Sequence, residues 1–231
     1  MLDFTRARDR ILLPRSGGSI ALLGEEREII AINEAGHAVV ALLSPHADPV
    51  EKVTITPQGA AMGFVLQSPD RDRVFETQAR LEARLGVMAA GRMAEQLAFG
   101  EDMITTGAAS GIQQATALAR AMVTRYGMSD FGFVVVNPND PALFDVNNPP
   151  ARMISTITAA GMDRSRQVLE ENLEGLNRLA VALLETETLS GEEARAIVTG
   201  EASGPDKAGQ CLIPPRETER RMRLPRLSRS A

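Results

Sequence analysis

The stretch Asn33-Glu34-Ala35-Gly36-His37 lies in the middle of a segment whose spacing predicts one helix, from about Glu25 to Leu43. Apolar residues recur in this segment every three or four positions, and acidic residues occupy its first turns, where the helix dipole favours them. Residues four positions apart lie on the same face of a helix. Asn33 and His37 are therefore expected to point the same way, with Glu34 beside them.

This pentapeptide differs at one position from His-Glu-x-x-His, a helical motif in which two imidazoles share a zinc ion. In that motif the Glu acts as general base on the metal-bound water. Glu34 and His37 match it, whereas Asn33 stands at the first His position. An amide oxygen is a weak ligand for zinc, which prefers imidazole or thiolate. The alternative interpretation is an ordinary amphipathic helix with one buried His.

The composition of the 231 residues favours a helical, aliphatic fold. Hydrophobic residues make up 44% of the chain but aromatic residues only 3%, so the core must be built from aliphatic side chains. Modules that bind nucleic acid by base stacking need aromatic residues, and a net charge of -5 provides no general basic surface. We therefore expect no nucleic-acid partner.

Cysteine usage and hydropathy indicate a cytoplasmic protein. Cys211 is the only cysteine, so no disulfide can form within the chain and a reducing compartment is expected. No apolar run approaches the roughly 20 residues that span a bilayer, and Pro14 interrupts the short apolar run near the N-terminus. We expect a soluble protein without a transmembrane segment.

The distribution of turn residues and apolar periodicity divides the chain into three parts. Residues 1–24 form an N-terminal arm, residues 25–199 a domain, and residues 200–231 a basic tail that we expect to be disordered. Within the domain, residues 25–136 carry the motifs and residues 151–199 form C-terminal helices. The predicted elements before residue 151 are helices over 25–43, 73–99 and 111–126, strands over 50–56, 63–67 and 131–136, and a loop over 137–150. The expected fold class is mainly α, with a small β element.

Several blocks in a fixed order resemble the peptidase domain of the FtsH family of AAA proteases, over about residues 25–199. Asn33 to Val40 is similar to the family's His-Glu-Ala-Gly-His-Ala helix, and Asp48 to Ile55 to the strand after it. The remaining blocks are Ala90 to Glu95, which resembles Gly-Gly-Arg-x-Ala-Glu, Thr106-Gly107-Ala108, Ala115 to Arg120, Met122-Val123, Tyr126 to Ser129, and Leu183 to Glu193.

This resemblance implies a mostly helical, ATP-fuelled zinc endopeptidase that works inside a hexamer on unfolded, tagged or membrane proteins. It implies metal-ligand positions at Asn33, His37 and Gly111, with Glu34 as general base. Gly111 stands at the Asp of the family's Thr-Gly-Ala-x-x-Asp pattern and has no side chain. Of three ligand positions, His37 alone keeps a zinc ligand. We therefore expect zinc to be absent or weakly bound and Glu34 to be idle.

Residues 1–231 contain no Gly-x-x-x-x-Gly-Lys-Ser/Thr loop, so we expect no ATP site in this chain. The two lysines, Lys52 and Lys207, lie in contexts that cannot cradle a phosphate. Unfolding of substrates would then need a partner, such as AAA subunits of the FtsH family. Self-association is a further possibility.

Three functions remain open at this point. The first is a pseudopeptidase that binds peptides or partner subunits, with Val53, Thr54, Ile55 and Thr56 as an edge strand that pairs with an extended peptide. The second is an active metallopeptidase with replacement zinc ligands, for which His46, Asp48 and Asp102 are the candidates. The third is a remnant that serves only oligomerisation.

Arg92 and Glu95 are three residues apart on a predicted helix. This spacing suggests an ion pair on the helix surface or between helices. Gly91 and Gly107 are interpreted as close-packing or turn glycines without a catalytic role.

Overall fold

The computed structural model describes residues 24–58, 61–69, 72–130, 132–137, 140–145, 147–201 and 212–213, except for the side chains of residues 142 and 144. These residues form six α-helices and one three-stranded antiparallel sheet, which confirms the predicted fold class. The helices are α2 (Gly24–Leu43), α3 (Gln78–Phe99), α4 (Ala109–Thr124), α5 (Pro149–Glu171), α6 (Leu173–Thr186) and α7 (Gly191–Thr199). The strands are β1 (Val50–Thr54), β2 (Phe64–Gln67) and β3 (Thr188–Ser190), and the short 3-10 helices are η1 (Glu101–Met103), η2 (Thr106–Ala108) and η3 (Pro141–Phe144).

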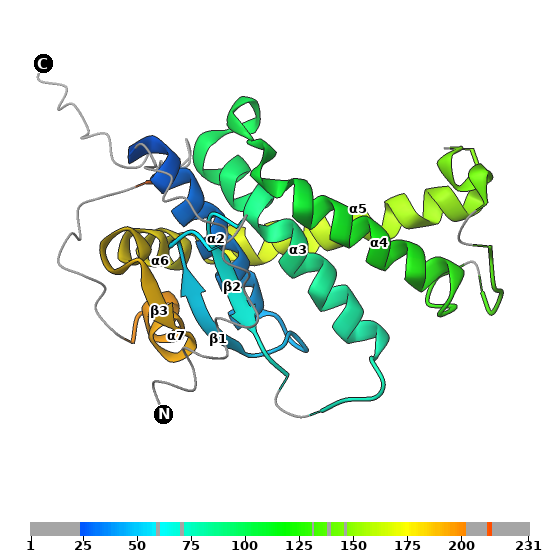
Figure 1. Cartoon of the computed structure of the whole chain (residues 1–231), viewed down its shortest axis with the longest axis horizontal. Coiled ribbons are helices and arrows are strands. Elements are labelled where there is room, and N and C mark those ends of the chain that lie inside the picture. Colours follow the sequence, from blue (N-terminus) through cyan, green and yellow to red (C-terminus); the bar gives the residue numbers. More distant parts are fainter. Residues whose placement is uncertain are drawn as a thin grey trace, which may run out of the picture.

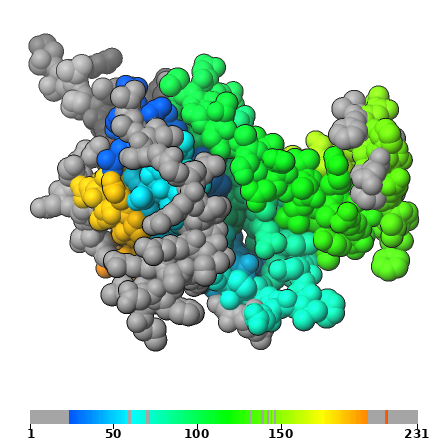
Figure 2. All heavy atoms as spheres, viewed as in Figure 1, coloured from blue at the N-terminus to red at the C-terminus, as the bar shows by residue number. Residues whose placement is uncertain are grey.

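Helix α2 lies at the centre of the molecule, packed against α3 and α6, with the sheet beside it (Figure 1). The main core cluster joins apolar side chains of α2, α3, α6 and α7 with those of β1 and β3. A second cluster joins α3, α4 and α5. Helix α4 and the residues after it extend to the right in Figure 2, away from the sheet. Across the described ranges, none of the helices combines the length and the apolar character that crossing a bilayer requires.

Helix α3 begins later than the predicted start at Arg73. Thr77 caps it, because its side chain accepts a hydrogen bond from the backbone N–H of Arg80. Helix α3 ends before Gly100, whose φ of 91° lies in the left-handed region that glycine adopts without strain. In the C-terminal part of the domain, Ser190 and Glu193 form a capping box at the start of α7.

Strand β1 is the central strand of the sheet, so the prediction that Val53 to Thr56 form an edge is wrong. The strand order is β2-β1-β3, and Val53 pairs with both Val65 and Leu189. Beyond β1, the Ile55 N–H donates to the Glu187 carbonyl at 2.9 Å. The prediction failed because β3 pairs with the second side of β1. The helical spacing of residues 151–199 does not indicate this three-residue strand, which lies between α6 and α7.

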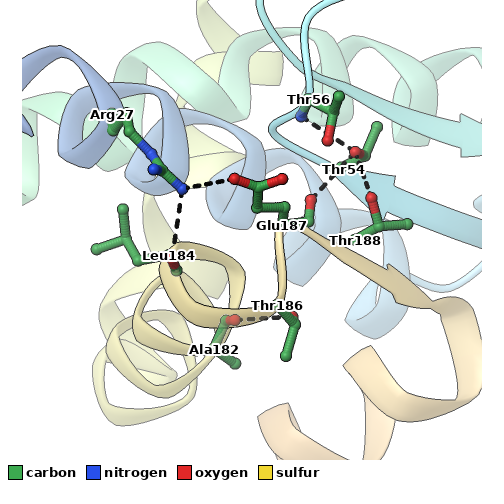
Figure 3. Close-up of polar contacts among 8 residues, drawn as sticks. All are labelled: Arg27, Thr54, Thr56, Ala182, Leu184, Thr186, Glu187 and Thr188. Atoms are coloured by element: carbon green, nitrogen blue, oxygen red, sulfur yellow. Dashed lines mark hydrogen bonds and ion pairs between the residues drawn. The ribbon is translucent and has the colours of Figure 1, made fainter. Parts of the chain in front are cut away.

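The connection from α6 to β3 fixes the outer side of the sheet (Figure 3). Glu187 ends α6 with a φ of 60°, and its carbonyl accepts the Thr54 hydroxyl at 3.1 Å. The Thr54 and Thr188 hydroxyls lie 2.7 Å apart, and Arg27 of α2 donates to the Glu187 carboxylate at 3.0 Å. These contacts join α2, β1 and β3 at one point.

The predicted strand over 131–136 is wrong for the part that the structure describes. Phe131 lies outside the described residues, and residues 132–136 form no strand. Instead, the Val136 N–H donates to the Thr124 carbonyl at 3.2 Å, which ties this segment to the end of α4. Phe133 is fully exposed. An apolar run of this length forms a strand only where another strand lies beside it to pair with.

The two ends of the chain are described only in part. The predicted arm over residues 1–24 lies outside the described residues except for Gly24. In the predicted tail, residues 202–211 and 214–231 also lie outside them. Leu212 and Ile213 of the tail are described, and their N–H groups both donate to the Asn177 side-chain oxygen of α6. Ile213 is buried against the main core cluster, which explains why this point of the tail is fixed.

Candidate functional site

A groove of about 690 Å³ opens between α2, β2 and α3, and residues at and before the start of α4 also line it. Apolar side chains contribute much of its wall. Its polar residues include the three that the sequence singled out on α2. The residues lining the groove are Ile29, Ile30, Asn33, Glu34, His37, Ala61, Met62, Gly63, Phe64, Val65, Gln67, Val87, Met88, Glu95, Thr105, Gly107, Ser110, Gly111 and Gln114.

Helix α2 presents Asn33 and His37 to the backbone of α3 at Gly91. A Cβ atom on Gly91 would lie 2.5 Å from both the Asn33 Oδ1 and the His37 Nε2 atoms. Real side chains do not approach this closely, so a larger residue at position 91 would require Asn33 and His37 to shift. The two side chains therefore converge on one point of α3, as their four-residue spacing predicts.

Asn33 links α2 to α3 through Glu95. The Asn33 side-chain N–H donates to Glu95 Oε1 at 2.6 Å, and Glu95 Oε2 accepts the backbone N–H of Thr105 at 2.8 Å. A carboxylate only accepts hydrogen bonds, so it fixes the orientation of the amide and leaves Asn33 Oδ1 as an acceptor. Glu95 is 1% exposed, so both bonds form away from water.

His37 is held through its second ring nitrogen. The Nδ1 atom lies 2.6 Å from the Val87 carbonyl, which can only accept, so Nδ1 carries the proton. Burial lowers the pKa of His37, while the Val87 carbonyl and the charge of Glu95 act in the opposite direction. The imidazole is therefore neutral near pH 7, with the Nε2 lone pair directed away from Val87.

Glu34 is buried at the side of the groove. Burial raises the pKa of its carboxyl from 4.5 to about 8, because the charged form loses its hydration. A Cβ atom on Gly63 would lie 2.7 Å from Glu34 Cγ, so the turn before β2 packs directly on this side chain. At neutral pH Glu34 is mostly protonated in this environment and has no proton-accepting charge.

Gly111 reaches the same groove from the start of α4, but it brings no side chain. A Cβ atom at this position would lie 2.6 Å from the Met88 carbonyl oxygen of α3. A backbone carbonyl inside a helix cannot move aside as a flexible side chain can. The structure thus brings Asn33, Glu34, His37 and Gly111 to one groove, with α3 and α4 packed too closely at Gly111 for a larger residue.

The donors at this point do not fit a zinc ion. Zinc sites in proteases have three protein ligands from His, Asp, Glu or Cys. Here Asn33 and His37 offer one amide oxygen and one imidazole nitrogen, while Gly111 offers nothing. Among the described residues no three His, Cys, Asp or Glu side chains gather where they could hold a metal ion.

The three candidate replacement ligands do not line the groove. His46 and Asp48 line a separate small recess at the start of α3, where Asp48 accepts a hydrogen bond from Arg73 at 2.5 Å. Asp102 is exposed on η1. The structure therefore brings none of the three to His37.

Glu95 is the site residue that sequence reasoning missed. The expected ion pair with Arg92 does not occur among the described residues, because Glu95 points inward to Asn33. The spacing from Gly91 carries a signal, since a residue four positions later lies on the same helical face. Gly91 was already interpreted as a close-packing residue, so Glu95 could have been placed at the same interface.

Comparison with known proteins identifies the family of this chain. The family model described as peptidase family M41 matches residues 21–197. The chain belongs to peptidase family M41. Its relatives include the ATP-dependent zinc metalloprotease FtsH of Caulobacter vibrioides, 41% identical over 214 residues, and that of Neorickettsia risticii, 42% identical over 204 residues.

These M41 relatives are much longer than this chain. The matches cover 87% and 86% of this chain but 34% and 32% of the two relatives, so the chain spans about a third of their length. FtsH 4 of Sorangium cellulosum, also named an ATP-dependent zinc metalloprotease, is 41% identical over 216 residues and is covered to 33%. The expected resemblance to the FtsH peptidase domain is thus confirmed at the level of the family.

Proposed function

We propose that this chain is an M41 domain that lacks zinc-dependent hydrolysis and binds extended peptide segments in the groove beside His37. The contact between Asn33 and Glu95 carries the proposal. By the family resemblance, Asn33 stands at the first ligand position, and here its amide links α2 to α3 at 2.6 Å. An Asn used in this way supports a packing role in place of metal binding.

The packing at Gly111 supports the same conclusion. The family resemblance assigns the third ligand to this position, and the Met88 carbonyl occupies the space that a side chain would need. A residue without a side chain at the third ligand position allows α3 and α4 to pack this closely. Within this proposal Glu34 has no metal-bound water to deprotonate. Its burial as a neutral acid is therefore compatible with the proposed function.

Peptide binding is supported by the free side of β2. Within the described ranges β2 pairs with β1 only, and residues of β2 line the groove together with apolar side chains of α2 and α3. A strand with one unpaired side can add an extended peptide through backbone hydrogen bonds, and the apolar wall can take its side chains. This proposal moves the peptide-binding edge from Val53–Thr56 to Phe64–Gln67.

The proposed partners are suggested by the names of the relatives. These relatives are named ATP-dependent, whereas residues 1–231 contain no phosphate-binding loop. We propose that the groove takes peptide segments that are already unfolded, or that AAA subunits of the FtsH family deliver to it. Assembly with such subunits, or with copies of this chain, belongs to the same proposal.

The test of the zinc part is elemental mass spectrometry of the purified, untagged protein after dialysis against trace zinc. We expect far less than one zinc per chain, and no cleavage of a short quenched-fluorescence peptide. Near-stoichiometric zinc that is lost in a His37→Ala variant would overturn this part. The replacement ligands would then have to be found outside the contacts described above.

The test of peptide binding uses fluorescence anisotropy of a labelled, unstructured, apolar peptide. Met62 lines the groove and Met103 does not, and both are partly exposed, at 39% and 60%. Met62→Asp should weaken binding about tenfold or more, because the peptide would desolvate a carboxylate. Met103→Asp is the matched control and should bind as the parent protein does. Equal effects of the two changes, or no binding at all, would refute a peptide site in this groove.

A further inference from the structure

One face of α3 continues from the groove into a second, smaller recess. Val87 lines both cavities, and so does Gln67 at the end of β2. Arg84 and Arg80 precede Val87 on the same helical face and line only the recess. A peptide that follows the groove past the end of β2 therefore meets these two arginines.

The recess contains an unsatisfied donor. The Arg80 NH1 atom is buried and has no hydrogen-bond partner, and it lies 3.5 Å from Asp48 Oδ1. Asp48 Oδ1 is already bound more closely by Arg73, at 2.5 Å. A buried donor without an acceptor is costly, so an acceptor that enters the recess would be stabilised.

Arg84 adds a second available cation. It is exposed, and among the described residues it makes no ion pair. The other charged groups around the recess are Arg73, Asp48 and Glu76, and His46 also lines the wall. Three arginines thus face two carboxylates, one of which is taken by Arg73. The remaining positive charge favours binding of a peptide carboxylate in this recess.

The size of the recess selects a small group. Its volume is about 20 Å³, which suits the head of one side chain and excludes a whole residue. Peptide segments from within a protein offer carboxylates mainly as Asp or Glu side chains, whereas a C-terminal carboxylate occurs once per chain. An acidic side chain is therefore the expected occupant.

The helix gives the spacing between this recess and the point beside His37. Arg84 and Arg80 precede Gly91 by seven and eleven residues, which at 1.5 Å per residue is roughly 10 Å and 16 Å. An extended peptide advances about 3.3 Å per residue. The two arginines thus lie about three and about five peptide residues from the point where Gly91 contacts His37.

We propose that the groove prefers peptides with an Asp or Glu about three to five residues from the position beside His37, bound by Arg84 and Arg80. This inference rests on the proposed function, since it requires a peptide in the groove. It adds a sequence preference to that function.

The experiment compares two labelled peptides with amidated C-termini, identical except that two Glu residues in one are Gln in the other. The parent protein should bind the Glu peptide about tenfold more tightly, which is the scale of a charge-assisted hydrogen bond. Arg84→Gln and Arg80→Gln should each reduce that ratio and leave the affinity for the Gln peptide unchanged. Because Arg84 is exposed, its variant tests the inference even if the Arg80 variant fails to fold.

Arg125→Gln is the matched control, because it removes the same charge from an exposed residue that caps the C-terminal end of α4. It should leave the ratio of the two affinities unchanged. A ratio near one in the parent protein, an equal effect of Arg125→Gln, or a preference only for a peptide with a free C-terminus would overturn the inference. In those cases the Gln peptide still binds, and failure of both peptides to bind would instead refute the proposed function.

Discussion

Asn33 and Glu95, separated by 62 positions in the chain, meet through a hydrogen bond of 2.6 Å between the Asn33 amide and Glu95 Oε1. The bond joins the two helices that form the floor of the groove, at a point where Glu95 is almost fully buried. A buried carboxylate that loses its donor retains the cost of its desolvation. The contact should therefore contribute measurably to stability.

Asn33→Ala should lower the free energy of unfolding by about 1–3 kcal/mol, because it leaves Glu95 Oε1 without a partner. Urea denaturation followed by circular dichroism measures this change. Gln113→Ala, on the exposed face of α4, is the control and should stay within about 0.5 kcal/mol of the parent. If both variants are equally stable, the Asn33 bond contributes nothing.

Gly111→Ala should destabilise the protein by about 1–2 kcal/mol, because the new Cβ would collide with the Met88 carbonyl. The sign is informative, since helix propensity alone makes Ala more stable than Gly by roughly 0.5–1 kcal/mol. Gly24→Ala at the start of α2, where no atom lies within 4 Å, is the control and should not destabilise. A stabilised Gly111 variant would show that α4 has room for a ligand-bearing side chain.

Replacing Asn33 by His and Gly111 by Asp together restores the family's ligand types but not their space. The same collision with Met88 applies to Asp at position 111, so we expect less than one zinc per chain in the double variant. Elemental mass spectrometry after dialysis against trace zinc measures it. Stoichiometric zinc together with peptide cleavage would show that the rest of the site is still organised for catalysis.

Glu34→Gln should gain stability relative to the parent as the pH rises from about 5 to 8. The pKa of Glu34 is raised to about 8 in the folded state, so its contribution is fully present below 4.5 and is lost as the pH rises. The difference between variant and parent should grow by at most about 1.4 kcal/mol per pH unit. Urea denaturation at several pH values measures it, and a constant difference would contradict the raised pKa.

Glu193→Gln is the control, because the pH dependence of its effect on stability should have the opposite sign. Hydrogen bonds from Ser190 lower the pKa of Glu193, so its contribution is present at neutral pH and is lost on acidification. The stability difference between the parent and this variant should therefore shrink below the ordinary pKa of a Glu. The two variants together separate burial of Glu34 from general effects of pH.

The imidazole of His37 should be mostly neutral at pH 6.5, where an ordinary His is half protonated. Its pKa is lowered by burial, so protonation requires a pH below the ordinary value of 6.5. Proton NMR of the ring signals measures this directly in a His46→Asn variant, which leaves one histidine. Asn tolerates the left-handed backbone of position 46, where φ is 67°. A titration midpoint at or above 6.5 would contradict the burial of the ring.

Local patterns predicted the helices well because their signals are local. The spacing of apolar residues predicted a helix from about Glu25 to Leu43, and α2 spans Gly24–Leu43. Strand β3 and the true edge of the sheet were missed, because strand pairing joins residues more than 130 positions apart. The apolar run after Gly132 misled for the same reason, since among the described residues no strand pairs with it.

The sequence by itself determined the mainly helical fold and the common helical face of Asn33 and His37 with Glu34 beside them, since these follow from residue types at fixed spacing. The order of the motif blocks indicated the family, and only that resemblance placed Gly111 in the same site. The tertiary structure alone decided that Asn33 is bound to Glu95, that Met88 fills the space at Gly111, and that β2 and not β1 borders the groove. These depend on how closely helices and strands distant in sequence approach one another. Spacing within a single element cannot specify that distance.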